Sequence, residues 1–568
     1  MIKQLRQYSS RFYTNYCSSE EQRQTWSFLL MTLIYLHLLF LPEIITLPLC
    51  IHYRTIPHLY MQNLTLLLLM SGLLLIFGRI GTRFLLILYG LWGVFNVITV
   101  FSLVKFHILV DATMLQILAV TESHEVGEFC QTYLHWYDFW PFVVILVCTI
   151  LLWRRTAKIT KFGRRLGMML CIPFCLAALP HLCTGHLSWF GKRNSLCRFI
   201  ATGFTQYNRE MKQIHSAMLS PELPKDIHLI PSELPDAGNG ALDYAPLGIV
   251  VVGESARRHN FQCYGYLRET TPRLMSYHKK CFFFDNVISP ATSTLRCCIY
   301  DFSMSTIGCF DSPQFSICDL LKSAGYSVAL YSNQRRSGNH ESLGMLFHNA
   351  DIKTYLMEEG NSDRHDMALL DYIRQSPLLE RKSKPAILFL HTMGSHHHAK
   401  KRYPDEFAIF PTELRDKSNE GFDTASAEYV NCYDNSIRYT DELLGRIMDF
   451  LEEQERPSFM LYLSDHAENL AKTKSDTDFR NALNPAVYEI PFVVYANNAY
   501  RKQWPSFIAE WADNISKPMQ ADATIFAIAS LARVTYAGFQ DNRNILSSRY
   551  VPVPRYMKEQ KKIPYPED

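Results

Sequence analysis

Residues 247–255 read LGIVVVGES, a near-continuous apolar run that stops abruptly at Glu254. Such a run is typical of a strand that is buried on both faces of a parallel sheet. Similar runs follow with helical patterns between them, and this alternation predicts an α/β domain with a mainly parallel sheet and helices on both faces. The later runs are SVALYSN (327–333), AILFLHTMGS (386–395), FMLYLSD (459–465) and IPFVVYAN (490–497).

Polar residues follow four of these strands where each strand should end. Glu254 follows the first, Asn333 and His391 follow the next two, and Asp465 with His466 follow FMLYLS. In open α/β sheets ligands bind at the carboxyl ends of the strands, so we expect these side chains to share one edge. Two carboxylates and an imidazole suit Zn²⁺ or a similar ion. The alternative is a surface loop in which Asp465 caps a helix.

A hydroxyl cluster lies between the first two of these strands. The stretch SPATSTLRCC (289–298) offers Ser289, Thr292, Ser293 and Thr294 in a turn before a predicted helix. A metal lowers the pKa of a bound hydroxyl, and a helix N-terminus stabilises an attached phosphate. The cluster therefore predicts a nucleophile, with a plain N-cap as the alternative.

Five apolar runs before residue 184 are candidate membrane spans. Residues 84–104 comprise 21 residues without a charge, which meets the roughly 20 residues that a helix needs to cross a bilayer. The other runs are 27–50, 59–78, 139–153 and 166–182.

Basic residues indicate how these spans are oriented. They precede the first run and separate the second from the third and the fourth from the fifth, whereas the loop at 105–136 is acidic. The positive-inside rule then places the N-terminus in the cytoplasm and every residue after 183 outside.

The net charge of +3 gives no support for binding nucleic acid.

Three regions follow from these patterns. Residues 1–183 are predicted to form a transmembrane domain of about five helices. Residues 184–245 are predicted to form interfacial helices and a proline-rich linker, and residues 246–568 the α/β domain. We expect the soluble part, starting between residues 218 and 245, to fold without the membrane region.

We also expect some of the cysteines from Cys183 onward to form disulfides outside the cytoplasm.

The stretch VVVGESARRHNFQCYGYLRETTPRL (250–274) is similar to one in phosphoethanolamine transferases. These membrane-anchored enzymes decorate lipopolysaccharide and belong to the alkaline phosphatase and sulfatase superfamily. The resemblance implies a five-span α-helical domain followed by an alkaline-phosphatase-like (sulfatase-like) soluble domain. It continues over the N-terminal region and in SPATST (289–294), YSNQRRSG (331–338), HTMGSHHHAKKRYP (391–404), YDNSIRYTDELL (433–444) and SDHAEN (464–469).

The resemblance also implies roles for single residues. The zinc ligands of the family match Glu254, Thr294, Asp465 and His466, and Thr294 is preferred over Thr292 because the family's nucleophile is the second Thr of a T-x-T. The remaining roles are a phosphoryl or second-zinc contact at His396, substrate binding at Asn333, and donor-lipid binding at Thr121 and Glu125.

Three departures from the family stand out. The run SDHAEN replaces the frequent SDHGES, and SDRHDM (362–367) lacks a cysteine pair seen in many members that modify lipid A. Glu489 stands before Ile490-Pro491 where the family has a His. We assign Glu489 to the substrate site, which leaves one predicted zinc site and a second one open.

The implied function is transfer of phosphoethanolamine from phosphatidylethanolamine to lipopolysaccharide (lipid A or core) or another envelope glycan. The transfer would proceed through a phospho-threonine at the zinc site. The implied location is the bacterial inner membrane, with the catalytic domain in the periplasm. One alternative is another enzyme of the superfamily, a glycerol-phosphate transferase or a sulfatase, although residues 289–298 lack the C/S-x-P/A-x-R motif of sulfatases. The other is an inactive membrane-anchored binding protein, against which the intact set of Glu254, Thr294, Asp465 and His466 argues.

Overall fold

The computed structural model describes most of the chain, and the account below concerns these residues: 19–39, 56–77, 79–106, 110, 126–127, 130, 134–155, 160–183, 205–233, 245–309, 314–335, 342–358, 364–380, 383–410, 424–468, 470, 484–557 and 562–566. They fall into two compact units, which are described separately. Unit 1 comprises residues 1–115 and 127–207, and unit 2 comprises residues 116–126 and 208–568.

The described part of unit 1 is mostly helical, and the described residues of each predicted apolar run lie almost entirely on one helix. The first run is described only as far as residue 39. Two segments, Arg79–Ser102 and Trp136–Arg155, are long and apolar enough to cross a membrane. The count of five spans therefore stays a prediction. The helices are α2 (Glu20–Leu39), α4 (Ile56–Ile76), α5 (Arg79–Phe106), α8 (Trp140–Arg155) and α9 (Lys161–Cys183).

Unit 2 is built around a seven-stranded sheet with the order β3-β9-β8-β2-β7-β5-β6. The strands from β8 to β6 run parallel to one another, and β9 is antiparallel to both of its neighbours. The predicted mainly parallel sheet is thus confirmed, with IPFVVYAN as the strand that runs in the opposite direction. The strands are β2 (Leu247–Gly253), β3 (Cys281–Phe284), β5 (Ser327–Ser332), β6 (Ile352–Tyr355), β7 (Ala386–His391), β8 (Ser458–Ser464) and β9 (Phe492–Ala496).

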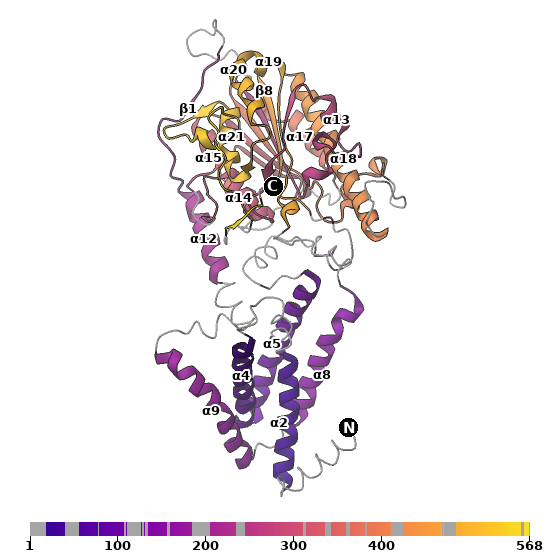
Figure 1. The fold of residues 1–568 in the computed structure, drawn as a ribbon, viewed down its shortest axis with the longest axis vertical. Coiled ribbons are helices and arrows are strands. Elements are labelled where there is room, and N and C mark those ends of the chain that lie inside the picture. The colour runs from indigo at the N-terminus through magenta and orange to yellow at the C-terminus, as the bar shows by residue number, and fades with distance from the viewer. Residues whose placement is uncertain are drawn as a thin grey trace. The chain divides into compact units, whose positions relative to one another are not determined.

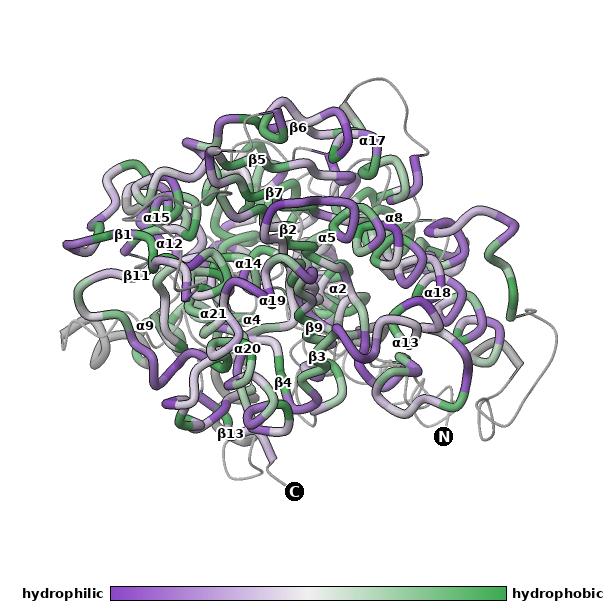
Figure 2. Tube along the Cα trace, turned by 90° about the horizontal axis from the view of Figure 1, so that it is seen from above, coloured by the Kyte–Doolittle hydropathy of each residue, from purple (hydrophilic) through white to green (hydrophobic). Residues whose placement is uncertain are grey.

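Helices cover both faces of this sheet, with α13, α17 and α18 on one side and α14, α15 and α21 on the other (Figure 1). Alternate strand residues such as Leu247, Ile249 and Val251 share one core cluster with α18. Figure 2 shows hydrophilic and hydrophobic residues alternating along α18, as expected of a helix with one buried face. The helices are α12 (Thr205–Leu219), α13 (Pro272–Ser276), α14 (Thr294–Phe302), α15 (Ile317–Ser323), α16 (Ser342–Leu346), α17 (Leu369–Arg374), α18 (Thr424–Glu452), α19 (Asn498–Gln503), α20 (Pro505–Trp511) and α21 (Thr524–Leu531).

Short strand pairs lie outside the main sheet. They are β1 (His228–Leu229) with β11 (Val534–Thr535), β4 (Val287–Ile288) with β10 (Met519–Gln520), and β12 (Tyr556–Met557) with β13 (Ile563–Pro564). The β1 pairing lies within the predicted proline-rich linker, so residues 220–233 are bound along unit 2. Further hydrogen bonds hold this segment, among them those from Ile230 N to Arg533 O and from Trp504 Nε1 to Pro231 O.

Helix α12 also belongs to unit 2 from residue 208 onward, although it lies in the predicted region 184–245. Its residues Met211, Ile214 and Met218 are buried, at the spacing of one helix face. On the same helix, the buried carboxylate of Glu210 accepts a hydrogen bond of 3.2 Å from Arg296 Nη2. A buried ion pair therefore joins α12 to α14 of the soluble unit, and one face of α12 is buried.

A soluble fragment that begins at residue 205 is expected to be more stable than one that begins at residue 220. The shorter fragment loses α12, and complete burial of each Met or Ile side chain contributes about 1.5–3 kcal/mol. Removing one partner of a buried ion pair typically costs a further ~3–5 kcal/mol. Urea unfolding of the two fragments measures the difference, with Lys212→Ala in the longer fragment as an exposed control. Equal unfolding midpoints would contradict this boundary.

The expected disulfides are absent from the described cysteines of unit 2. Cys263, Cys281, Cys297, Cys298, Cys309, Cys318 and Cys432 are free thiols. Several are buried in the core on separate elements, where they act as apolar residues. Burial raises the pKa of the Cys263 thiol to about 12. The prediction of disulfides is therefore wrong for these seven residues.

Candidate functional site

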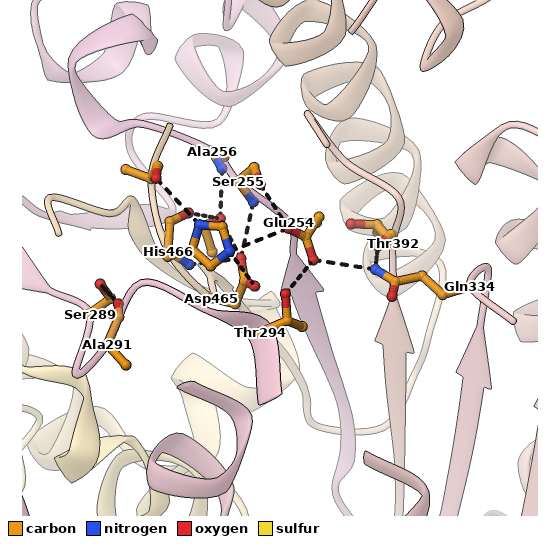
Figure 3. A network of polar contacts seen from close by, with 12 residues as sticks. Glu254, Ser255, Ala256, Ser289, Ala291, Thr294, Gln334, Thr392, Asp465 and His466 are labelled. Carbon is orange, nitrogen blue, oxygen red and sulfur yellow. Dashed lines mark hydrogen bonds and ion pairs between the residues drawn. The ribbon is translucent and has the colours of Figure 1, made fainter. Parts of the chain in front are cut away.

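Strands β2 and β8 are neighbours, and their carboxyl ends bring three predicted ligands together. Gly253 pairs with Ser464, so Glu254 and Asp465 leave the sheet side by side, followed by His466. One ligand atom from each of these three buried residues lies within 4.8 Å of the others. Figure 3 shows the three side chains converging on one point. Among the described residues, no other group of three or more His, Cys, Asp or Glu meets this criterion.

The hydrogen bonds around these ligands leave donor atoms available for a metal ion. Asp465 Oδ1 accepts hydrogen bonds from Ser255 N at 3.0 Å and His466 N at 2.7 Å. Within the described residues, Asp465 Oδ2 has no hydrogen-bond partner and lies 3.4 Å from His466 Nε2. His466 Nδ1 lies 3.3 Å from Ala467 O, so a proton on Nδ1 leaves the lone pair of Nε2 available. Two carboxylates and one imidazole nitrogen with these free atoms fit Zn²⁺.

The hydroxyl of Thr294 completes this group. Thr294 is the first residue of α14, and its Oγ1 donates a hydrogen bond of 3.1 Å to Glu254 Oε2 (Figure 3). Ser289 is fully buried, and its hydroxyl donates instead to Ala291 O at 2.8 Å. Ser293 is the N-cap residue, but its side chain makes no capping hydrogen bond. Thr294 is thus the hydroxyl of the predicted cluster that contacts Glu254.

Gln334 contacts the same carboxylate and is absent from the residues predicted from sequence. Its Nε2 donates to Glu254 Oε2 at 3.4 Å and to Thr392 O at 2.9 Å. The neighbouring Asn333, predicted to bind substrate, directs its Nδ2 to Asp366 Oδ1 at 2.8 Å. The role of Asn333 therefore stays a prediction. One feature of the sequence could have indicated Gln334: it follows Asn333 directly, after the end of β5.

The loop after β7 lies against Glu254 and carries His396. Gly394 has a φ of +50°, and a Cβ atom there would lie 2.7 Å from Glu254 O. Ser395 N donates to that same oxygen at 2.9 Å. The carboxylate of Asp366 accepts from Met393 N and Gly394 N, and burial raises the pKa of Asp366. These contacts hold the loop in place next to the proposed metal ligands.

Two further buried groups shape the surroundings of Glu254. Ser255 has a φ of 57°, a left-handed conformation that is uncommon for serine and occurs at functional sites. Its carbonyl oxygen accepts from the Tyr433 hydroxyl at 2.6 Å. His391, at the end of β7, is 4 % exposed. Burial lowers the pKa of His391 to about 4, although the negative charge of Glu254 acts to raise it. His391 is therefore a neutral imidazole near pH 7.

Glu489 lies in a different cluster of charged side chains. It forms ion pairs with Arg258 at 3.0 Å and with His259, and it accepts from the Tyr565 hydroxyl at 2.8 Å. Partial burial raises the pKa of Glu489, but His259, Arg258 and Tyr565 outweigh this effect and lower it to about 2. Its predicted role in substrate binding stays a prediction. Thr121 and Glu125 lie outside the described residues.

Family profiles match both parts of the chain. The profile described as Sulfatase matches residues 246–531, about half of the chain. The profile described as Phosphoethanolamine transferase EptA/EptB matches residues 64–208. One similar protein is the phosphoethanolamine transferase EptA of Helicobacter pylori, which is 32% identical over 267 residues, 45% of this chain and 48% of that protein. The chain spans about half the length of the curated relatives it matches.

Solved structures share the fold. The integral membrane lipooligosaccharide phosphoethanolamine transferase A of Neisseria meningitidis matches 93% of this chain and 98% of its own, with a TM-score of 0.63 and 19% identity. The periplasmic domain of EptC from Escherichia coli matches 60% of this chain and 93% of its own, with a TM-score of 0.53 and 21% identity. The chain therefore belongs to the sulfatase family, and proteins named phosphoethanolamine transferases are among the relatives that it matches.

Proposed function

We propose that the protein transfers phosphoethanolamine from phosphatidylethanolamine to lipopolysaccharide, in lipid A or core, or to another envelope glycan. The observation that carries the proposal is the hydroxyl of Thr294, which lies 3.1 Å from Glu254 Oε2, the carboxylate that clusters with Asp465 and His466. A hydroxyl that is hydrogen-bonded to a carboxylate in a group of metal ligands is the arrangement expected for phosphoryl transfer through a covalent intermediate. The names of the matched relatives support phosphoethanolamine as the transferred group.

In the proposed first step, Thr294 Oγ1 attacks the phosphorus of phosphatidylethanolamine. The Oγ1–P bond forms, the bond from phosphorus to the glycerol oxygen breaks, and diacylglycerol leaves after its oxygen takes up a proton. Glu254 Oε2 accepts the proton of Thr294, because that hydrogen bond is already made, and passes it to the departing glycerol oxygen. In the second step an acceptor oxygen attacks the same phosphorus, the Oγ1–P bond breaks, Thr294 Oγ1 takes up the proton that the acceptor releases, and phosphoethanolamine is transferred.

Glu254, Asp465 and His466, with Thr294 as a fourth ligand, would hold one Zn²⁺. The ion supplies positive charge that lowers the pKa of the Thr294 hydroxyl and stabilises negative charge on the phosphoryl oxygens. The solved zinc complex of the Escherichia coli EptC domain supports this choice of metal.

Other residues of the chain take binding roles in this proposal. The first turn of α14 directs backbone N–H groups toward a phosphoryl group on Thr294. His396 would neutralise charge on the phosphoryl oxygens, since its loop is held against Glu254. Asn333 and Glu489 would bind the substrate, and Thr121 with Glu125 the donor lipid.

A membrane location suits this reaction because the donor is a lipid. We propose that residues 1–183 span the bacterial inner membrane about five times. Residues 184–245 would lie at the interface or connect the two parts, although those from 208 onward belong to unit 2, and residues 246–568 would form the catalytic domain in the periplasm. The basic segments before and between the spans support this orientation.

Mass spectrometry of lipopolysaccharide tests the acceptor. A strain that lacks the protein is expected to lose a phosphoethanolamine substituent, which the wild-type chain restores and the Thr294→Ala variant does not. Fragmentation of the molecule locates the substituent on lipid A or core. Unchanged lipopolysaccharide, with a substituent lost from periplasmic glucans instead, would reject lipopolysaccharide as the acceptor.

A further inference from the structure

Arg296 is a buried cation that the proposed reaction does not use. It is the third residue of α14, only 2 % exposed, and every residue of that helix after Thr294 is buried. Its Nη2 donates a hydrogen bond of 3.2 Å to Glu210 Oε2, and Glu210 is 6 % exposed. The pair joins α14 to α12 across 86 positions of sequence.

Local energetics do not account for this arginine. A cation in the first turn of a helix opposes the positive end of the helix dipole. Burying a guanidinium group is costly unless an anion and hydrogen bonds compensate it. The carboxylate of Glu210 supplies that compensation, but a well-packed apolar pair would typically be at least as stable. The pair is therefore better explained by what it orients than by the stability it adds.

The first turn of α14 connects this pair to Thr294. Thr294 and Arg296 are two residues apart, about 3 Å along the helix axis. Arg296 is held by a directional contact to α12, and Leu295, between the two residues, is buried. A shift or rotation of this turn would move Thr294 Oγ1 away from Glu254 Oε2, which lies 3.1 Å away.

We propose that Glu210 and Arg296 are positioning residues that hold the first turn of α14 so that the Thr294 hydroxyl faces Glu254. The inference rests on the proposed function in taking Thr294 as the nucleophile. The pair acts through α14 and does not contact the substrate.

The test uses full-length protein with Glu210→Gln, Arg296→Met and the double variant. Each single variant is expected to slow formation of the phosphoethanolamine adduct on Thr294 on the order of tenfold to hundredfold, as misplacement by about 1 Å does. We expect kcat to fall with little change in KM for phosphatidylethanolamine, and zinc content to be retained. The double variant tests whether both changes act through the contact between Glu210 and Arg296: slowing no greater than in the slower single variant supports the inference, and additive slowing contradicts it.

A second readout does not depend on transfer. Hydrogen exchange of peptides that cover residues 294–298 should accelerate in Glu210→Gln, while exchange in β2 stays unchanged. If the wild-type protein forms no adduct on Thr294, the proposed function fails, and the exchange result alone decides the positioning role. Unchanged exchange in residues 294–298 overturns the inference.

Arg268 and Asp434 form a matched control pair. Arg268 Nη1 contacts Asp434 Oδ2 at 2.7 Å, and their side chains are 6% and 0% exposed. Arg268→Met should lower the melting temperature as Arg296→Met does, yet leave the adduct rate per folded molecule unchanged. If Arg268→Met slows adduct formation as much as Arg296→Met does, the slowing results from general destabilisation, and the inference is overturned. A loss confined to Arg296→Met, with Glu210→Gln fully active, would overturn it in favour of direct contact between Arg296 and the phosphate.

Discussion

Thr294→Ala is expected to abolish the covalent phosphoethanolamine adduct and the transfer reaction, while the fold is retained. Losing the nucleophile of such a site removes several orders of magnitude in rate, because only binding and electrostatic stabilisation remain. The fold should survive because the remainder of α14, from Leu295 to Phe302, is buried and holds the helix in place. Intact-protein mass spectrometry after incubation with phosphatidylethanolamine measures the adduct directly.

Neighbouring hydroxyls provide the controls for this experiment. Thr294→Ser keeps the hydroxyl and loses the methyl group that restricts its rotamers, so part of the activity should remain. Thr292→Ala and Ser293→Ala should retain the adduct, since only Thr294 of this cluster contacts Glu254. An adduct that persists in Thr294→Ala, or that maps to Thr292 or Ser293, would show that another hydroxyl is the nucleophile.

The same assay separates the competing enzymes of the superfamily. Incubation with phosphatidylglycerol should give no adduct if phosphoethanolamine is the transferred group. A glycerol-phosphate adduct on Thr294 would instead identify a glycerol-phosphate transferase. Absence of any adduct from a zinc-loaded protein would favour an inactive binding protein.

Glu254→Ala and Asp465→Ala are each expected to lose bound zinc. Each substitution removes one charged ligand from a group of two carboxylates and one imidazole. The affinity for zinc should fall by more than the roughly 10–100-fold that is typical when an outer-shell partner is removed. Metal analysis of purified protein, and competition with a chelator, give the stoichiometry and the affinity.

Glu489→Gln is the matched control for the zinc experiment. Glu489 is also a partly buried carboxylate, but it is paired with Arg258 and His259 and is not one of the three clustered ligands. Glu489→Gln should therefore retain one zinc ion for each chain. Full zinc occupancy in Asp465→Ala or Glu254→Ala would reject these ligands, and loss of zinc in Glu489→Gln would indicate a second site that includes this residue.

The sequence by itself determined the sheet and the clustering of the three candidate metal ligands. Apolar runs such as 247–253 and 458–464 form strands in which every residue is buried, as their near-continuous apolar sequence predicts. The carboxyl ends of neighbouring parallel strands meet at one edge, so the residues directly after them must lie close together. Glu254, Asp465 and His466 were therefore predictable from local pattern alone, without knowledge of how distant helices pack.

Only the tertiary structure decided which hydroxyl contacts Glu254 and what surrounds it. The residue types of Ser289, Thr292, Ser293 and Thr294 do not distinguish them, and the preference for Thr294 came from the family resemblance; the direction of each side chain depends on where α14 begins. The contact of Gln334 with Glu254 joins residues 80 positions apart, and that of Arg296 with Glu210 joins residues 86 positions apart. Likewise, the prolines of residues 220–233 suggested a linker, whereas strand pairing and packing bind this segment to unit 2. Such contacts have no sequence period, because they depend on how separate elements pack around the common core.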